Sequence, residues 1–157
     1  MTADQHPQLV SWWKDDPSDP DRPRADDPDV RRLADRIAPG STSRDLGDVM
    51  SFSLALDSNG LVLRVHQSFV SRARLLALQQ VRTRLAETGL IVPVAREWRG
   101  STLFRCPRRW AELESFIPNT WLPVSWDSHE WLFERVGDLH RALASIQVAP
   151  PRPLVAT

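Results

Sequence analysis

The alternation of apolar and polar positions predicts a β-hairpin over residues 48–67. The stretch SFSLAL alternates large apolar residues with serine and alanine, and the turn after it ends in Asn59-Gly60, a dipeptide typical of hairpins. In the following stretch, LVLRVH, successive side chains point to opposite faces of the strand. One face of this strand is therefore wholly apolar, and the other carries Arg64 and His66 beside a valine.

Two helices are predicted on either side of this hairpin. The first lies in DDPDVRRLADRIAPG, with Asp27 as its N-cap, Pro28 at its first helical position and Pro39-Gly40 as its stop. The second covers residues 69–88 and is followed by Gly89, a residue typical of helix C-termini. Its apolar residues recur at helical spacing and form one stripe, made of Leu75, Leu78, Val81 and Leu85.

A third helix is predicted near the C-terminus, over about residues 127–146. Asp127 and Glu130 fit a capping box at its start. Its apolar stripe, which we expect to be buried, consists of Leu132, Val136, Leu139, Leu143 and Ile146.

Between the second and third helices, two further stretches predict extended structure. The stretch LIVPVAREWRGSTLFRC indicates a strand, a turn at Gly100 and a second strand, and WAELESFIPN indicates another extended segment. Helices and strands in this order predict an α+β fold. We expect an antiparallel sheet of about five strands, with the helix of residues 69–88 packed against it.

The composition divides the chain into four parts. Residues 1–28 hold seven Asp, five Pro and no Gly, which is typical of a flexible arm. Residues 29–118 contain the predicted sheet and two helices, and residues 119–147 contain the third helix. Residues 148–157 form a Pro-rich tail.

Composition also narrows the class of protein. The chain has 157 residues, 41% of them hydrophobic, and a formal net charge of zero, so its total charge does not indicate a nucleic-acid or membrane partner. Cys106 is the one cysteine, which excludes an intrachain disulfide and suits a reducing compartment. No apolar run approaches the ~20 residues of a membrane-spanning helix. We therefore expect a cytoplasmic protein that binds neither membrane nor nucleic acid.

Taken in order, these stretches resemble the front half of the aminoglycoside phosphotransferase and choline kinase-like family, which has the protein-kinase fold. The matching pieces are GSTSRDLGDVMSFSLAL, LVLRVH, a helix ending in LAETGLIVPV, then AELESFIPN and WLFERVGDLHRAL. The resemblance covers about residues 30–147. It implies that residues 29–118 are a kinase-like N-lobe, with an antiparallel sheet and a packed helix. Residues 119–147 would then hold the segment after the hinge and the LH helix of the second lobe.

The resemblance also implies a nucleotide site. Arg64 stands where the family has the basic residue that meets the ATP phosphates, although a solvent-facing arginine would satisfy the same pattern. The loop expected to cover the nucleotide contributes Ser41, Thr42 and Ser43, which could donate hydrogen bonds to phosphate. The alternative is that they are ordinary loop residues with no role in binding. The hinge, whose main-chain groups would meet adenine, contributes Glu114, Ser115 and Phe116.

The sequence departs from the family in its catalytic residues. The family's HGDxxxxN loop and metal-binding Asp lie beyond the LH helix, and no HGD occurs in this chain. The acid expected in the helix of residues 69–88 is also absent, since Glu87 at its far end is the only one. We therefore assign no catalytic residue and no metal ligand. ATP is the implied nucleotide, and Mg²⁺ would require carboxylates from a partner lobe.

Two functions agree with these features. The chain is either the nucleotide-side part of a phosphotransferase, as a fragment or as half of a split enzyme, or a degenerate module that binds a protein or peptide, for example in a biosynthetic complex. Seven tryptophans favour a large contact surface, unless most of them are in the core. We expect such a surface at Trp131 and Phe133, covered by another protein chain or by a second copy. Trp12 and Trp13 would be a further contact with the partner, unless they dock on the chain's own core.

Overall fold

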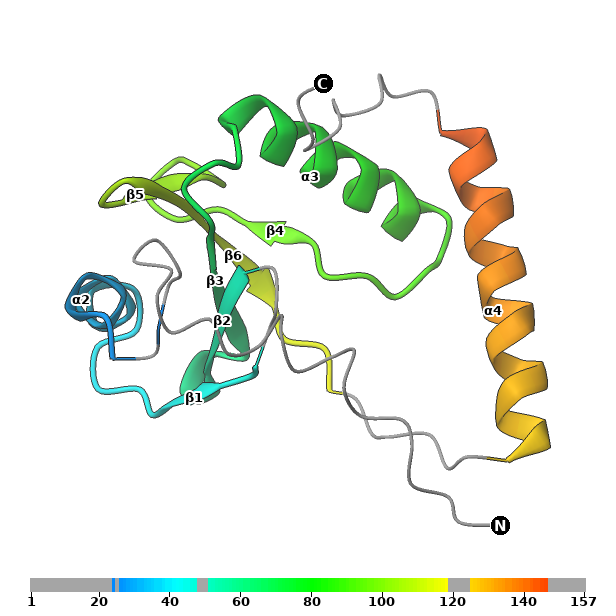
Figure 1. Cartoon of the computed structure of the whole chain (residues 1–157), viewed down its shortest axis with the longest axis horizontal. Coiled ribbons are helices and arrows are strands. Elements are labelled where there is room, and N and C mark those ends of the chain that lie inside the picture. The colour runs from blue at the N-terminus through cyan, green and yellow to red at the C-terminus, as the bar shows by residue number, and fades with distance from the viewer. Residues whose placement is uncertain (1–23, 25, 48–50, 119–124, 147–157) are drawn as a thin grey trace, which may run out of the picture.

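The computed structural model describes residue 24 and residues 26–47, 51–118 and 125–146 (Figure 1). This part of the chain has three α-helices and six strands, and the α+β fold with one antiparallel sheet is confirmed. The predicted arm and the Pro-rich tail lie outside the described residues, apart from the last residues of the arm. Trp12 and Trp13 lie outside them as well.

The sheet has the strand order β1-β2-β3-β6-β4, and β5 also pairs with β6. All neighbouring strands are antiparallel. The strands are β1 Ser43–Asp45, β2 Ser51–Leu56, β3 Leu61–His66, β4 Ala95–Arg96, β5 Phe104–Cys106 and β6 Arg109–Ser115. Strand β6 is the longest, and it pairs with three other strands, so it holds the sheet together.

The sheet differs from the prediction at its two ends. Part of the loop expected to cover a nucleotide is strand β1, because Thr42 C=O accepts a hydrogen bond from Asp57 N–H and Leu46 N–H donates to Ser53 C=O. At the other end, β4 and β5 do not form the predicted hairpin, since both pair with β6. The predicted turn at Gly100 lies between β4 and β5, and it is closed by an isolated antiparallel β-bridge between Trp98 and Ser101.

The hairpin of β2 and β3 is confirmed. Its connection is a short 3-10 turn, η1 (Asp57–Asn59), followed by Gly60 with φ +60°. Glycine adopts this positive φ without the steric cost that a side chain would add. In the hairpin, Leu54 lies opposite Leu63, and Ser53 lies opposite Arg64. The two faces therefore remain separate, one apolar and one polar.

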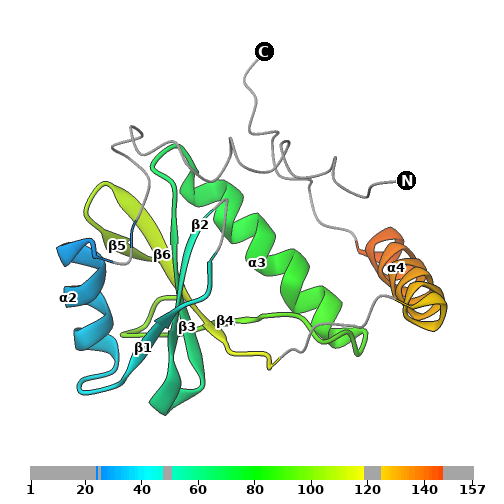
Figure 2. The same cartoon turned by 60° about the horizontal axis from the view of Figure 1, so that its bottom comes forward.

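The apolar face of the sheet lies toward helix α2 (Pro28–Ile37), while helix α3 (Arg72–Glu87) lies on the other side (Figures 1 and 2). Asp27 caps α2 as predicted, and its side chain accepts a hydrogen bond of 2.9 Å from Asp29 N–H. The buried core between α2 and the sheet includes Val30, Leu33, Phe52, Leu54, Leu56, Leu63, Val65, Cys106 and Leu113.

The apolar stripe predicted for α3 is only partly correct. Leu75 and Leu85 are buried, but Leu78 and Val81 are half-buried, and Gln79 is buried instead. The helix is oriented so that Gln79 and Arg82 point to the polar face of the sheet, where both donate hydrogen bonds to Glu112. The side chains of the sheet, and not the spacing within the helix, therefore determine which face of α3 is covered.

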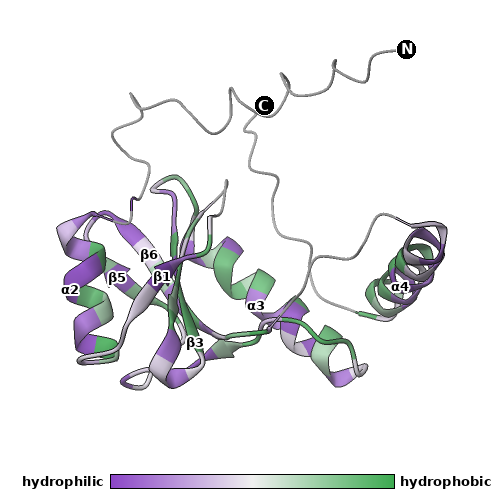
Figure 3. Ribbon diagram, turned by 90° about the horizontal axis from the view of Figure 1, so that it is seen from below, coloured by the Kyte–Doolittle hydropathy of each residue, from purple (hydrophilic) through white to green (hydrophobic). Residues whose placement is uncertain are grey.

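Helix α4 (Trp126–Ser145) stands apart from the sheet, on the far side of α3 (Figure 1). Figure 3, which is coloured by hydropathy, shows that α4 carries both apolar and polar residues. The stripe predicted to be buried is largely exposed, and Ala142 is the one buried residue of this helix. The exposed members of the stripe are Leu132, Val136 and Leu143.

The start of α4 also differs from the prediction. Ser125 is the N-cap, and its hydroxyl accepts a hydrogen bond of 3.2 Å from Ser128 N–H. The helix therefore begins one residue before Asp127, and the predicted capping box with Glu130 is not the cap that forms. Among the helices of the described residues, none is long and apolar enough to cross a membrane.

The orientation of α3 predicts unequal effects for two leucines on this helix. Leu75 is 1% exposed, whereas Leu78 is half-buried. We expect Leu75→Ala to lower the free energy of unfolding by about 2–5 kcal/mol. Leu78→Ala should cost less than half as much, measured by urea unfolding of both variants. Equal losses would indicate that the two leucines are equally buried, as the periodicity alone predicts.

Candidate functional site

Two nearly fully buried carboxylates lie next to each other on the α3 side of β6. Glu112 and Glu114 are each 1% exposed. Because alternate residues of a strand face the same side, both side chains point away from α2. A carboxylate out of water is costly unless cations or hydrogen-bond donors surround it. Strand β3 and helix α3 supply these partners.

Strand β3 contributes two basic side chains. Arg64 Nε donates to Glu114 Oε2 at 3.1 Å, and Arg64 Nη1 donates to Ser51 Oγ at 2.9 Å. His66 Nε2 lies 2.9 Å from Glu112 Oε1. In the strand register Arg64 lies opposite Glu112, so the Arg64–Glu114 and His66–Glu112 contacts are both diagonal contacts between neighbouring strands.

Helix α3 contributes an arginine that reaches both carboxylates. Arg82 Nη2 donates to Glu112 Oε2 at 2.6 Å, and Arg82 Nη1 donates to Glu114 Oε1. One turn earlier, Gln79 Nε2 donates to Glu112 Oε2 at 2.7 Å. Helix and sheet are thus joined by polar contacts. We call this set the buried charge cluster: Arg64, His66, Gln79, Arg82, Glu112 and Glu114.

The surroundings of Glu112 set its ionisation. Burial alone would raise the pKa of this carboxyl group, but the hydrogen bond with His66, the charge of Arg82 and the hydrogen bond from Gln79 outweigh burial. Together they lower the pKa from 4.5 to about 2. Glu112 is therefore a carboxylate at neutral pH.

Beside the cluster, the same side of the sheet opens into a cavity of about 560 Å³, a size typical of small-molecule sites. Arg44 and Arg64 contribute positive charge to its lining. The Arg44 guanidinium lies 6.0 Å from the centroid of the Phe116 ring, which also lines the cavity. The remaining lining residues are Leu46, Val62, Pro93, Glu114, Ser115, Ile117 and Pro118.

The cavity brings together four of the seven residues that the sequence assigns to a nucleotide site, namely Arg64, Glu114, Ser115 and Phe116. The other three lie by the hairpin turn and do not line the cavity. Ser41 Oγ accepts a hydrogen bond of 3.0 Å from Ser58 Oγ, and Thr42 C=O accepts one from Asp57 N–H. Ser43 begins β1 opposite Leu56.

The main chain of the predicted hinge is partly engaged within the protein. Ser115 N–H donates to Val94 C=O at 3.4 Å, and Phe116 N–H donates to Gly60 C=O at 2.9 Å. Glu114 is part of β6, with its side chain under Arg64 and Arg82. Ile117, the next residue of the predicted hinge, also lines the cavity.

The sequence prediction missed three residues of this region, which are Arg44, Arg82 and Glu112. The two glutamates could have been found from the stretch WAELES, because they occupy alternate positions of a largely apolar strand and therefore share one face of the sheet. No comparable local signal marks Arg82, because its partners lie 30 and 32 residues further along the chain.

The described residues do not provide a cluster of ligands suited to magnesium. Within the described residues, no group of three or more His, Cys, Asp and Glu side chains is placed to hold a metal ion. Mg²⁺ takes six oxygen ligands, several of them often water, and commonly one or two carboxylates. The two buried carboxylates, Glu112 and Glu114, are already bonded to arginines.

The two partner-binding residues predicted on the third helix lie on α4 and are exposed. Trp131 is 48% exposed and Phe133 is 74% exposed. Trp126, at the start of the same helix, is 83% exposed. These aromatic side chains do not contribute to the core of the described fold.

Together, the fold and the site define an α+β domain in which a buried charge cluster lies beside an open cavity that contains arginine. Comparison with known proteins does not place this domain in a family. No family model matches the chain, and no curated protein matches it.

The lowered pKa of Glu112 predicts a loss of stability in acid. The folded protein binds the Glu112 proton less readily than the unfolded chain does, so this contribution is complete above about pH 4.5. It is lost as the pH falls toward about 2. The change in pKa corresponds to roughly 3 kcal/mol. We expect urea unfolding between pH 6 and pH 2 to show this loss in the wild type.

A pair of variants separates Glu112 from other acids. Glu112→Gln should be less stable than the wild type at pH 7 and should lack this part of the pH dependence. Glu87→Gln, at an exposed position of α3, should keep it. An unchanged pH dependence in Glu112→Gln would show that Glu112 does not have the lowered pKa.

Proposed function

We propose that this chain is the nucleotide-side lobe of a phosphotransferase like those of the aminoglycoside phosphotransferase and choline kinase-like family. In this proposal it binds ATP but does not transfer phosphate by itself. The observation that carries the proposal is the cavity. It joins Arg64 on the hairpin to Ser115 and Phe116 at the hinge, which the resemblance selected from separate parts of the sequence.

The electrostatics of the cavity support an anionic ligand. Arg64 and Arg44 both line it, and an arginine binds phosphate oxygens through paired hydrogen bonds. In protein kinases, the basic residue of the corresponding strand is held by a glutamate from the C-helix. Here Glu114 on the sheet holds Arg64, and α3 brings Arg82 to the same carboxylate. The basic residue is thus held in position although the helix has the opposite charge.

The apolar part of the cavity suits a nucleobase. Leu46, Val62 and Ile117 line it, and the Ile117 main chain would meet the polar edge of adenine. Transfer of phosphate would also need a base near the acceptor hydroxyl and carboxylates for Mg²⁺. In this proposal a partner lobe supplies both.

Calorimetric titration with ATP, ADP and adenosine tests the proposal. Arg64→Ala should weaken ATP binding by roughly 10- to 100-fold, since a hydrogen bond to a charged group contributes about 1.5–3 kcal/mol. Adenosine binding should change little, because adenosine has no phosphate. Arg44→Ala should act in the same direction, and it removes an exposed side chain, so the fold should be kept.

The matched control is Arg84→Ala, which removes an exposed arginine of α3 that is paired with Glu87. It should leave ATP binding unchanged. Equal ATP affinity in the wild type, Arg64→Ala and Arg44→Ala would contradict the proposed site. Mg²⁺-dependent transfer from ATP by the purified chain, lost in Arg64→Ala, would contradict the proposed lack of catalysis.

A second candidate function is a non-catalytic module that binds another protein chain or a second copy through α4. The exposed apolar residues of this helix favour it. Trp126 is exposed at its start, followed five to seven residues later by Trp131, Leu132 and Phe133. Large exposed apolar patches mark interaction surfaces, and burying one such side chain contributes about 1.5–3 kcal/mol.

Sedimentation velocity tests this second function. We expect the wild type to form a dimer whose population rises with concentration, and the double change Trp131→Ser and Phe133→Ser to give a monomer. Arg135→Ser, an exposed change on the same helix, should still dimerise. A wild-type monomer that binds no apolar dye would contradict a contact role for α4.

A further inference from the structure

The outer end of the β5–β6 hairpin carries arginines around a tryptophan. The Arg105 guanidinium lies 3.9 Å from the centroid of the Trp110 ring, and that of Arg72, the first residue of α3, lies 6.0 Å from it. Arg108 is exposed in the turn between the two strands. We call these four residues the arginine–tryptophan surface: Arg72, Arg105, Arg108 and Trp110.

The arginines of this surface have no carboxylate partner in the part of the chain that the structure describes. Arg72, Arg105 and Arg108 take part in none of its ion pairs. An arginine stacked on an aromatic ring keeps donors along the edge of its guanidinium. The surface therefore presents several positive charges to an anionic partner.

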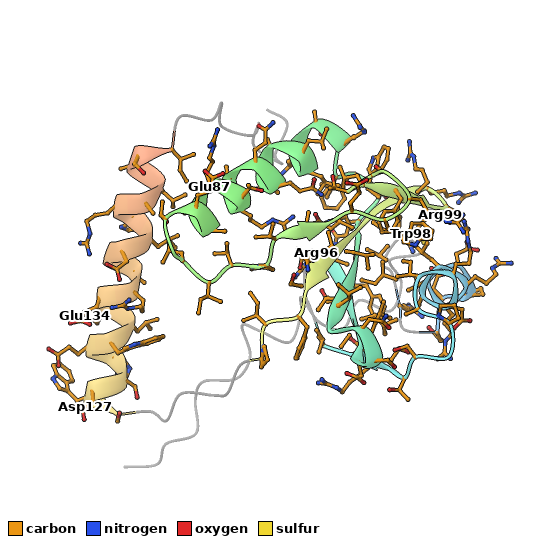
Figure 4. All side chains as sticks on the ribbon, turned by 180° about the vertical axis from the view of Figure 1, so that it is seen from behind. Glu87, Arg96, Trp98, Arg99, Asp127 and Glu134 are labelled. Carbon is orange, nitrogen blue, oxygen red and sulfur yellow. The ribbon has the colours of Figure 1, made fainter. Side chains whose placement is uncertain are left out.

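The basic character continues around the edge of the sheet toward α2. Arg99 and Arg36 lie over the Trp98 ring, with guanidinium carbons 4.8 Å and 5.7 Å from its centroid. Figure 4 shows Trp98 and Arg99 together at this end of the molecule. Residues 60–118 contain ten Arg and four Glu, an excess of six positive charges, although the whole chain is neutral.

Half of the compensating negative charge lies in the N-terminal arm, where residues 1–23 have a net charge of −3. Residues 1–23 contain five Asp against Lys14 and Arg22, and four of these aspartates fall in the short stretch DDPSDPD, residues 15–21. This concentration of acid lies close in sequence to the point where the described chain begins. Residues 15–21, with four aspartates in seven residues, hold more acidic residues than any other stretch of seven residues in the chain.

The chain enters the described structure at the β5–β6 hairpin, on the α2 side of the sheet, whereas Trp110, the residue after Arg109 in β6, faces the α3 side. Arg109 Nη1 donates to Asp27 Oδ2 at 2.9 Å, and Arg109 lies between Arg108 and Trp110 in sequence. Asp21 precedes Arg24 by three residues, which span at most about 10 Å of extended chain. Asp15 precedes it by nine residues, or at most about 30 Å. These lengths set how far each aspartate can lie from the point where the described chain begins.

We propose that the acidic stretch of residues 15–21 docks on the arginine–tryptophan surface of the same chain. Opposite charge supplies the attraction, and the short connection through Asp27 gives the arm a high effective concentration at the surface. The docked arm, with a net charge of −3 over residues 1–23, reduces the excess of six positive charges and competes with other polyanions for this surface. Because the contacts are exposed ion pairs, added salt weakens them.

A spin label on the arm of the full-length chain tests this docking. Ser18→Cys places a reactive thiol in the arm, while Cys106 is buried, and burial raises the pKa of its thiol to about 11, so it does not react. At low salt, the label should broaden the backbone amide signals of residues 104–110. About 0.5 M NaCl, where charges are screened within about 4 Å, should restore these signals.

Charge reversal identifies the receiving residues. The double change Arg105→Glu and Arg108→Glu alters two exposed side chains and should abolish the broadening. Arg135→Glu, an exposed change on α4, should leave it unchanged. Replacement of the four aspartates of residues 15–21 by asparagine should also allow the protein to bind heparin at a salt concentration where the wild type does not.

Several results would overturn the proposal. One is the absence of broadening at residues 104–110 at low salt, and another is stronger broadening on α4 than on the hairpin. Broadening that persists after charge reversal would show that the arginines do not receive the arm. Broadening of an unlabelled isotope-enriched copy mixed with the labelled chain would show that the arm docks on another molecule.

Discussion

The two buried carboxylates of β6 determine how the described fold is assembled. Strand β3 approaches Glu112 and Glu114 with Arg64 and His66, and helix α3 approaches them with Arg82. Removing one partner of a buried ion pair typically costs about 3–5 kcal/mol, which is a large share of the stability of a small domain. The position of α3 on the sheet therefore depends on satisfying these charges at least as much as on the apolar area that it buries.

The same constraint shapes the cavity. Two carboxylates and two arginines neutralise each other in the cluster, so the positive charge that a ligand meets depends on Arg44 and on the exposed part of Arg64. Arg64 has 26% of its side chain exposed, whereas that of Glu114 has 1%. The carboxylate is thus shielded from a ligand, and the guanidinium above it is not. One arginine links the interior of the fold to the proposed binding site, which explains why a charge lies in so apolar a strand.

The sequence predicted the elements that local chemistry determines. Asn59-Gly60 identified the hairpin, and Asp27 before Pro28 identified the start of α2, because turn and cap preferences depend on a few adjacent residues. The orientation of α3 and the pairing of both β4 and β5 with β6 depend on distant residues, and helical spacing does not contain that information. Arg64 was found from the sequence and the resemblance together, whereas Arg82 became apparent only from its contacts across the sheet.

Net charge gives an incomplete picture of this chain. The value of zero for 157 residues combines six excess positive charges over residues 60–118 with a net charge of −3 over residues 1–23 and −3 over the remaining residues. A net charge of zero therefore predicts that the protein does not bind polyanions only while the acidic arm is docked on the sheet domain. The sheet domain without the arm has an excess of positive charge. The cavity, α4 and the arginine–tryptophan surface belong to different parts of the molecule, so the arm can neutralise the charge at the β5–β6 hairpin without occupying the cavity that contains Arg64.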